Sequence, residues 1–348
     1  MADPPASRRR GGGVQFNFLD SQYFSFLTAV PGSLKFPGMP PQAAKTPWVE
    51  EQQPMNFYRN WFLASRPWSF AMTAISVSVG SAMAAIEGAF DWPLYLLALL
   101  SAVLLHAATN LINDYYDVVN GVDTVAAATA QYRPHPLVEG LLPARQVQRV
   151  GFALFGLAAL IGLYLVAVRG PMVLWIGLVG LLAGLTYTAP PLKYKYVALG
   201  EVSVFLMWGP LMVEGAYYVQ RQSLSLPALW VSLPFGVLVA LVLLANNIRD
   251  IDHDRSRNIL TLAILLGRRR GRDAYLLLMV LSYLGIVALA GILTPWVLII
   301  LLTTPLAARL LQEMTHAVPA DADARTAKLD TAFGVLLVVS LVLEGLIG

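Results

Sequence analysis

The stretch WVSLPFGVLVALVLLANNIRDIDHD, residues 230–254, joins a long apolar run to a dense cluster of polar and acidic side chains. The cluster holds three aspartates in five positions: Asp250, Asp252 and Asp254. Ionisable residues that border an apolar helix are costly to place, so a functional role is the first hypothesis. If the helix continues, Asp250 and Asp254 share one face, with Asn247 one turn earlier. Their carboxylate and amide oxygens suit Mg²⁺ better than Zn²⁺. The alternative is a solvated helix end capped by polar residues.

The composition places this chain among polytopic membrane proteins. Of its 348 residues, 57% are hydrophobic and 13% are charged, whereas soluble domains carry about 25% charged residues. The net charge is only +3, so membrane topology explains the basic residues better than binding of nucleic acid does. The absence of cysteine excludes disulfides, thiolate nucleophiles and cysteine-ligated metals.

Apolar spans of about 17–25 residues, the length that crosses a bilayer, recur from Trp68 onward. The fold class that we expect is all-α, a polytopic membrane protein with nine transmembrane helices. Their predicted ranges are 68–87, 92–112, 147–168, 171–189, 198–219, 228–247, 273–292, 294–311 and 329–347.

The distribution of basic residues supports this number of spans. Nine spans place all but Arg169 and Arg221 of the 24 Lys and Arg residues on one side. Because cytoplasmic connections carry an excess of Lys and Arg, we expect the N-terminus and both acidic clusters in the cytoplasm. The C-terminus then lies outside.

Residues 1–58 differ from the rest of the chain. They contain an arginine triplet, a glycine triplet and many prolines, so we expect a largely irregular cytoplasmic extension. Its aromatic residues are also compatible with a segment that docks on a membrane face or on a protein partner. Residues 59–348 form the predicted helical domain.

A second polar stretch lies at the end of the second predicted span. Its residues fall at spacings of three and four, which places them on one helical face: His106, Asn110, Asn113, Asp114 and Asp117. Gly121 is expected to end this helix, with Asp123 in the loop that follows. The two acidic clusters are about 130 residues apart, so only the fold can bring them together.

Two facing acidic clusters have a known chemical use. Mg²⁺ ions between them turn the repulsion of a diphosphate, with roughly three negative charges, into coordination. The metal also neutralises the charge that develops on a departing diphosphate. Cations that could complete such a site are Arg66, Arg133, Lys193, Lys195 and Arg249.

A leaving diphosphate in a membrane suggests an isoprenoid substrate with its tail in an apolar groove. Aromatic faces could stabilise the allylic cation that remains, although an interfacial aromatic belt explains any single tyrosine as well. The tyrosines near the predicted site are Tyr115, Tyr116, Tyr187, Tyr194 and Tyr196.

On these motifs the chain resembles the UbiA superfamily of intramembrane aromatic prenyltransferases, over residues from about 59 to 347. Its naphthoquinone branch is the most similar, which includes 1,4-dihydroxy-2-naphthoate prenyltransferases of menaquinone synthesis and the animal menaquinone-4 synthase. The matching segments are Arg66-Pro67-Trp68-Ser69-Phe70, Asn110-x-x-Asn113-x-Tyr115-Tyr116-Asp117, Pro136-Leu137-Val138-x-Gly140, Lys195-Tyr196-x-Ala198-Leu199-Gly200-Glu201, Asn246-Asn247-x-Arg249-Asp250, Thr261-Leu262-Ala263 and Arg325-Thr326-Ala327-Lys328-Leu329.

The resemblance implies an enzyme that condenses a polyprenyl diphosphate with an aromatic acceptor, using Mg²⁺. In the dihydroxynaphthoate enzymes the ring carboxylate leaves as CO₂. The implied metal ligands are Asp114, Asp117, Asp123, Asp250 and Asp254, and all of these except Asp123 form the implied catalytic set. The implied substrate-binding residues are Arg66, Asn110, Asn113, Tyr187, Lys193, Lys195, Asn247 and Arg249. The expected location is a bacterial plasma membrane.

One departure from the family pattern keeps other functions open. Bacterial dihydroxynaphthoate enzymes carry Gly-Lys shortly after the second motif, where this chain has Asn258-Ile259. The alternatives are a prenyltransferase for another acceptor, a cation carrier or channel, and a noncatalytic member that binds quinone or a partner complex.

Overall fold

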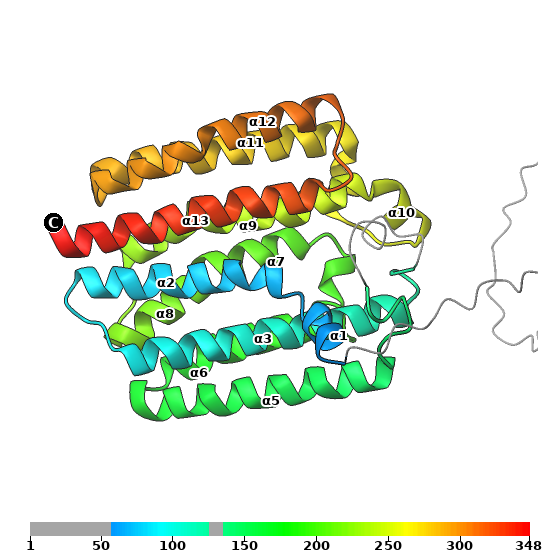
Figure 1. Ribbon diagram of the computed structural model, residues 1–348, viewed down its shortest axis with the longest axis horizontal. Coiled ribbons are helices and arrows are strands. Elements are labelled where there is room, and N and C mark those ends of the chain that lie inside the picture. Colours follow the sequence, from blue (N-terminus) through cyan, green and yellow to red (C-terminus); the bar gives the residue numbers. More distant parts are fainter. Residues whose placement is uncertain (1–56, 125–134) are drawn as a thin grey trace, which may run out of the picture. The chain divides into compact units, whose positions relative to one another are not determined.

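The computed structural model describes residues 57–124 and 135–348, and Figure 1 shows their helices side by side along one direction. The predicted extension, except for Phe57 and Tyr58, lies outside the described residues, as does Arg133. The α-helices are α1 (Phe57–Ala64), α2 (Phe70–Ile86), α3 (Trp92–Val119), α5 (Ala144–Arg169), α6 (Met172–Thr186), α7 (Gly200–Leu206), α8 (Met212–Arg221), α9 (Leu226–Arg249), α10 (Ile251–Ser256), α11 (Leu262–Ile292), α12 (Thr304–His316) and α13 (Ala322–Ile347). Short helical segments between them are η1 (Pro67–Ser69), η2 (Tyr194–Tyr196), η3 (Met207–Leu211) and η4 (Pro295–Thr303).

The all-α membrane class is confirmed. Within the described ranges, eight helical stretches are long and apolar enough to cross a membrane. A ninth apolar helix, α6, has 15 residues and is shorter than the others. The expected nine spans therefore correspond to eight full-length helices and one short one.

Side chains at the loop ends determine where several helices begin. Asp91 caps α3 by accepting the backbone N–H of Leu94 at 3.0 Å. Ser225 does the same for α9 through Ala228, at 3.2 Å. Such caps satisfy N–H groups that have no partner inside the helix. Each cap restarts the chain as a helix after a tight connection.

Two helices differ from their predicted ranges in ways that affect the site. The predicted span 92–112 continues to Val119 as α3, so the whole polar face of the first cluster lies on one helix. The predicted span 198–219 is interrupted at η3, where Gly209 leaves helical geometry and Pro210 follows. Proline has no N–H to continue the hydrogen-bond ladder, which explains the break. A Cβ on Gly236 would lie 2.8 Å from Gly209 Cα, so η3 packs against α9 only because both residues are glycines.

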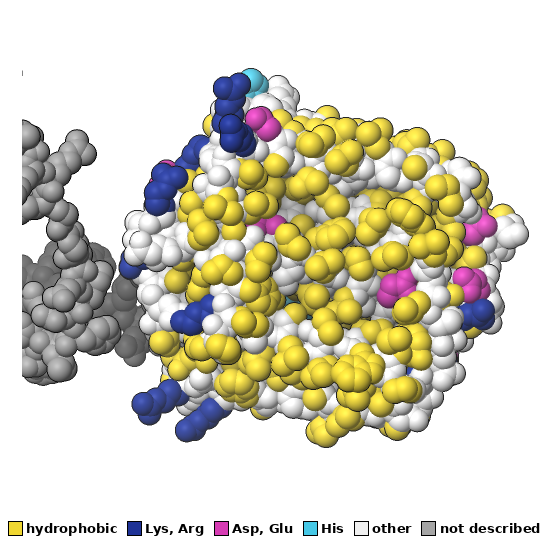
Figure 2. Space-filling view, turned by 180° about the vertical axis from the view of Figure 1, so that it is seen from behind, with side chains coloured by type: hydrophobic (Ala, Val, Ile, Leu, Met, Phe, Trp, Pro, Cys, Tyr) yellow, Lys and Arg dark blue, Asp and Glu magenta, His cyan; other side chains and the backbone are white. Residues whose placement is uncertain are grey.

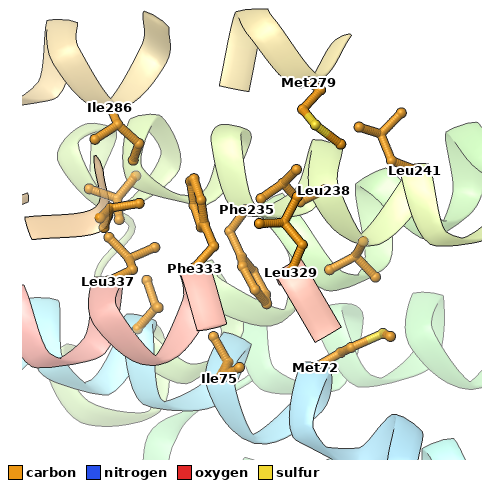
Figure 3. Close-up of a cluster of buried hydrophobic side chains, with 14 of the residues drawn as sticks. Met72, Ile75, Phe235, Leu238, Leu241, Met279, Ile286, Leu329, Phe333 and Leu337 are labelled. Carbon is orange, nitrogen blue, oxygen red and sulfur yellow. The ribbon is translucent and has the colours of Figure 1, made fainter. Parts of the chain in front are cut away.

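The largest hydrophobic cluster joins α2, α9, α11 and α13. Figure 3 shows Phe235 and Phe333 at its centre, with Ile75 on one side and Ile286 on the other. Phe235, Phe333 and Ile286 are fully buried. This packing fixes α9, the helix that carries the second acidic cluster, against the last helix of the chain.

The flank of the bundle is apolar, unlike the surface of a soluble protein. Large apolar side chains such as Trp92, Leu160 and Leu302 are exposed, and hydrophobic atoms cover much of the face in Figure 2. Lys and Arg side chains gather mainly toward one end of that face. A bilayer provides the partner that such a flank needs.

Candidate functional site

Three connections meet at one end of the bundle, the end where Figure 1 labels α1 and α10. His253 of α10 donates a hydrogen bond from Nε2 to the carbonyl oxygen of Val122, at 3.0 Å. The Ala198 N–H donates to Leu260 O at 2.8 Å, and the Leu260 N–H donates to Tyr196 O at 3.2 Å. The ends of α3 and α9 are thus tied to each other and to the connection that contains η2.

Asp114 and Asp117, both on α3, are buried beside basic side chains. Arg66 forms an ion pair with Asp114, whose side chain is 3% exposed. Lys195 Nζ lies 2.6 Å from Asp117 Oδ2, and Tyr196 OH donates to the other Asp117 oxygen. Burial is the largest single effect and lowers the pKa of Lys195, but Asp117 and the other neighbouring acidic groups together outweigh burial, so the pKa is raised. This lysine is therefore firmly protonated.

The two asparagines of α3 connect these ion pairs to their surroundings. Asn113 Oδ1 accepts a hydrogen bond from Lys195 Nζ at 3.3 Å. Asn110 Nδ2 donates to Ser65 O at 3.0 Å and to Ser69 Oγ at 3.3 Å. Both bonds hold the turn in which Arg66 adopts a left-handed backbone, with φ 57°. Asn110 thus fixes the segment that aims Arg66 at Asp114.

His135 is a site residue that the sequence analysis did not identify. Its Nε2 lies 3.1 Å from Asp123 Oδ2, and its Nδ1 faces the Val138 N–H at 3.4 Å. One ligand atom each from Asp114, Asp123 and His135 lie within 4.8 Å of one another. Burial raises the pKa of Asp123, but the His135 hydrogen bond and the nearby cations outweigh it and lower the pKa. Its only sequence signal was a histidine twelve residues after Asp123.

The second cluster is organised by Arg249. Its guanidinium contacts both oxygens of Asp250 at 2.7 Å. It also donates to Asn246 Oδ1 and to Asp323 Oδ1, each at 2.7 Å. Asp323 lies in the first turn of α13, 74 positions after Arg249 in the sequence. Arg249 therefore joins the second cluster to the last helix.

Two further residues of the second cluster are buried in different surroundings. Asp254 on α10 is 8% exposed. Burial, and next the charge of Asp250, raise the pKa of Asp254 to about 6, against the opposing effects of Lys195 and His253. Asn247 Nδ2 donates to Glu201 Oε1 at 2.9 Å. Asn247 thus links α9 to α7.

Tyr187 and the two predicted lysines occupy different places. Lys195 Nζ lies 5.8 Å from the centre of the Tyr187 ring, a cation–π distance. Tyr187 and Lys195 both line the large cavity described next. Lys193 begins the η2 turn and is not among the residues that line this cavity. The two lysines therefore differ in their access to the cavity, although the sequence analysis named both as substrate-binding residues.

A cavity of about 600 Å³ opens from this site into the bundle. The lining on α3 runs from Asp117 back to Ala98, a rise of about 28 Å along a helix. The polar end carries Arg66, Asn113, Asp117, Asp123 and Lys195. Mainly apolar and glycine residues line the rest, among them Leu165, Val173, Gly180 and Met212. The cavity fits a molecule with an anionic head and a long apolar tail.

The predicted site residues divide into two groups around this cavity. Those that line it are Arg66, Asn110, Asn113, Asp117, Asp123, Tyr187 and Lys195. Those outside its lining are Asp114, Lys193, Asn247, Arg249, Asp250 and Asp254. The oxygen donors of the five aspartates match the ligand preference of Mg²⁺.

Comparison with known sequences shows what this chain is similar to. Residues 73–337 match the profile of the UbiA prenyltransferase family. The 1,4-dihydroxy-2-naphthoate octaprenyltransferase of Bacillus subtilis (strain 168) is 29% identical over 286 residues, which cover 80% of this chain and 91% of that protein. UbiA prenyltransferase domain-containing protein 1 of Danio rerio is 33% identical over 287 residues, 81% of this chain and 84% of that protein.

Solved structures share the fold at lower identity. A UbiA homolog from Aeropyrum pernix K1 superposes with a TM-score of 0.60 at 17% identity, over 79% of this chain and 97% of that one. A UbiA homolog from Archaeoglobus fulgidus, bound to GPP and Mg²⁺, gives 0.56 at 16% identity, over 80% and 99%. These likenesses establish the helical architecture.

Proposed function

Since the chain belongs to the UbiA prenyltransferase family, we propose that it transfers a polyprenyl group from a polyprenyl diphosphate to 1,4-dihydroxy-2-naphthoate in menaquinone synthesis. The observation that carries this proposal is the cavity, which joins a charged end to an apolar interior about as long as a bilayer is thick. The similarity to a dihydroxynaphthoate octaprenyltransferase supports the choice of acceptor.

In this proposal the charged end binds the diphosphate and positions its leaving oxygen. Arg66 and Lys195 line the cavity and supply fixed positive charge to the phosphate oxygens. The aspartates of both clusters would hold Mg²⁺, which neutralises the charge that develops on the departing diphosphate. Asp114, Asp117 and Asp123 would act from α3 and its loop, and Asp250 and Asp254 from the second cluster.

The apolar interior holds the prenyl tail and excludes water from the allylic carbon. Exclusion of water matters because an allylic cation would otherwise react with it. Aromatic rings next to the polar end, those of Tyr187 and Trp208, line the cavity and present π-electrons to the developing cation. The acceptor ring then attacks C1, and its carboxylate leaves as CO₂.

The proposal includes an orientation in the membrane. Helices α3 and α9 end on the same side, and basic residues gather there, from Arg255 to Arg272 and at Arg325 and Lys328. By the positive-inside rule this side is cytoplasmic and the C-terminus lies outside. We assign the protein to a bacterial plasma membrane.

A direct assay tests the reaction. Purified protein is incubated with dihydroxynaphthoate and prenyl diphosphates of several lengths, with Mg²⁺ or with a chelator. The products are identified by mass spectrometry. We expect a decarboxylated prenyl naphthoquinol only with Mg²⁺. Prenylation of another acceptor alone would overturn the acceptor, and no transfer to any acceptor would overturn the proposed reaction.

A further inference from the structure

Arg249 of α9 is shared between two carboxylates from different parts of the chain. It pairs with Asp250 through two hydrogen bonds and with Asp323 through one, each 2.7 Å long. The Arg249 side chain is 6% exposed, and the side chains of both partners are 13% exposed. Solvent therefore screens these contacts less than it screens surface ion pairs.

Arg249 donates five hydrogen bonds to residues within the described part of the chain. Besides the two aspartates, it donates to Asn246 Oδ1 at 2.7 Å and to Ala320 O at 3.0 Å. These contacts match the five N–H donors of a guanidinium. Two of the acceptors, Asp323 and Ala320, come from the beginning of α13 and the connection before it. The beginning of the last helix thus helps to orient Arg249.

The shared arrangement has an electrostatic consequence for Asp250. A metal ion that binds Asp250 must compete with the positive charge of Arg249. Because Asp323 attracts the same guanidinium, it weakens the hold of Arg249 on Asp250. Without the Asp323 charge, Arg249 and Asp250 would form a neutral, tighter pair that binds a cation less well.

We propose that Asp323 is a positioning residue of the second metal cluster, which keeps Asp250 available to a divalent cation by sharing Arg249. Asp323 also lines the cavity, beside Ala324 and Ala327 of α13, so this residue borders the proposed substrate site. This inference rests on the proposed function, because it assigns Asp250 to the metal.

The experiment measures metal binding without substrate. Full-length protein in detergent is titrated with Mn²⁺, and free Mn²⁺ is followed by electron paramagnetic resonance. We expect Asp323→Asn to weaken Mn²⁺ binding about ten-fold, a modest effect for close charge pairs. Asp323→Glu, which keeps the charge, should bind within about three-fold of the wild type.

Asp321→Asn is the matched control. Asp321 precedes α13 by one residue and pairs with Arg325 at 2.7 Å, with a side chain that is 42% exposed. The substitution removes the same charge from the same helix end but leaves Arg249 untouched, so Mn²⁺ binding should not change. Equal metal affinity in the Asp323→Asn and Asp321→Asn variants would overturn the inference.

Turnover provides a second readout. Excess Mg²⁺ should recover most of the turnover lost in Asp323→Asn, whereas a purely structural defect lowers turnover at every Mg²⁺ concentration and would overturn the inference.

If Asp323→Asn unfolds at a lower temperature than the wild type, comparison of Asp323→Gln with Asp323→Glu gives the same charge change at matched side-chain length. A wild type that neither binds Mn²⁺ nor transfers prenyl groups would overturn the proposed function. Normal wild-type turnover with unchanged metal affinity in Asp323→Asn would overturn only this inference.

Discussion

The two acidic clusters hold their carboxylates in different ways. Each aspartate of the first cluster has its own partner from a different segment: Arg66 for Asp114, Lys195 for Asp117 and His135 for Asp123. In the second cluster exposed Asp252 pairs with Arg268, whereas the guanidinium of Arg249 is shared between Asp250 and Asp323 of α13. The first cluster is therefore a set of separate pairs, whereas in the second Asp250 shares its cation with a residue of another helix.

The two clusters should therefore respond differently when a metal ion and a diphosphate bind. Three partners that come from separate loops can respond one at a time when metal and diphosphate arrive. A shared guanidinium cannot release one carboxylate without changing its hold on the other. Loss of one partner in the first cluster should therefore affect mainly the aspartate that it contacts, whereas loss of Arg249 should affect both Asp250 and α13.

The largest expected effect is loss of a metal-binding acid from either cluster. Asp114→Asn and Asp250→Asn should each lower kcat about a hundred- to a thousand-fold, because charge stabilisation of the leaving diphosphate is lost. Prenyl transfer by purified variants measures this, with melting temperature as a check on folding. Full activity in both variants would refute the assignment of metal-binding roles to the two clusters.

The second prediction separates the two lysines. Lys195→Met should lower prenyl transfer about a hundred-fold and reduce stability by about 3 kcal/mol, because buried Asp117 would lose its cation. Lys193→Met should change both by little, since Lys193 does not line the cavity. Steady-state kinetics and thermal melts of the two variants, compared side by side, measure the difference. Equal defects would contradict the separate roles.

The third prediction concerns the pair of His135 with Asp123. His135→Ala should weaken metal affinity about ten-fold, because a carboxylate that ligates a metal loses the partner that orients it. His135→Gln, which can still donate to Asp123, should restore most of that affinity. Mn²⁺ titration measures the effect, and His316→Ala, at the exposed end of α12, is the matched control. A defect of the same size in His316→Ala would rule out a specific role.

The smallest expected effect is a pH dependence of the second cluster. The pKa of Asp254 is raised to about 6, first by burial and then by Asp250, so this carboxylate becomes neutral as the pH falls below that value. The pKa of Asp123 in the first cluster is shifted downward instead, so that carboxylate stays ionised over the same pH range.

Metal affinity should therefore fall about three- to four-fold between pH 7.5 and pH 5.5, because a protonated carboxyl is a poor ligand. Metal titrations at several pH values measure this change. Asp254→Asn should start from weaker binding and lose this dependence. A variant with an unchanged pH profile would show that another group titrates.

Much of the candidate site could be found from local sequence. The spacing of Asn110, Asn113, Asp114 and Asp117 on one helical face required only the periodicity of an α-helix. Their partners His135 and Tyr196 were harder, because nothing near them in sequence distinguishes a contact made across loops. Arg249 was expected at a diphosphate, and the structure places it against Asp250 and Asp323. Its role at the substrate stays a prediction.

In the fold, too, some features could be predicted from local sequence and others depend on tertiary contacts. Apolar length alone indicated the spans, because a bilayer requires backbone hydrogen bonds to be satisfied within each helix. Local patterns did not predict the interruption at η3 or the start of α11 at Leu262, where 273 was expected. Both depend on contacts with neighbouring segments, such as Gly209 against Gly236 and Leu260 against Tyr196.

The sequence by itself determined a helical membrane protein with two acidic clusters and a family resemblance, because hydrophobic length and helical periodicity are local properties. The tertiary structure alone decided which cation faces which carboxylate, which lysine reaches the cavity, and that Asp323 shares Arg249 with the second cluster. The physical reason is that charge pairing acts over a few ångströms in space, whereas the residues that make these pairs lie up to 78 positions apart in the chain.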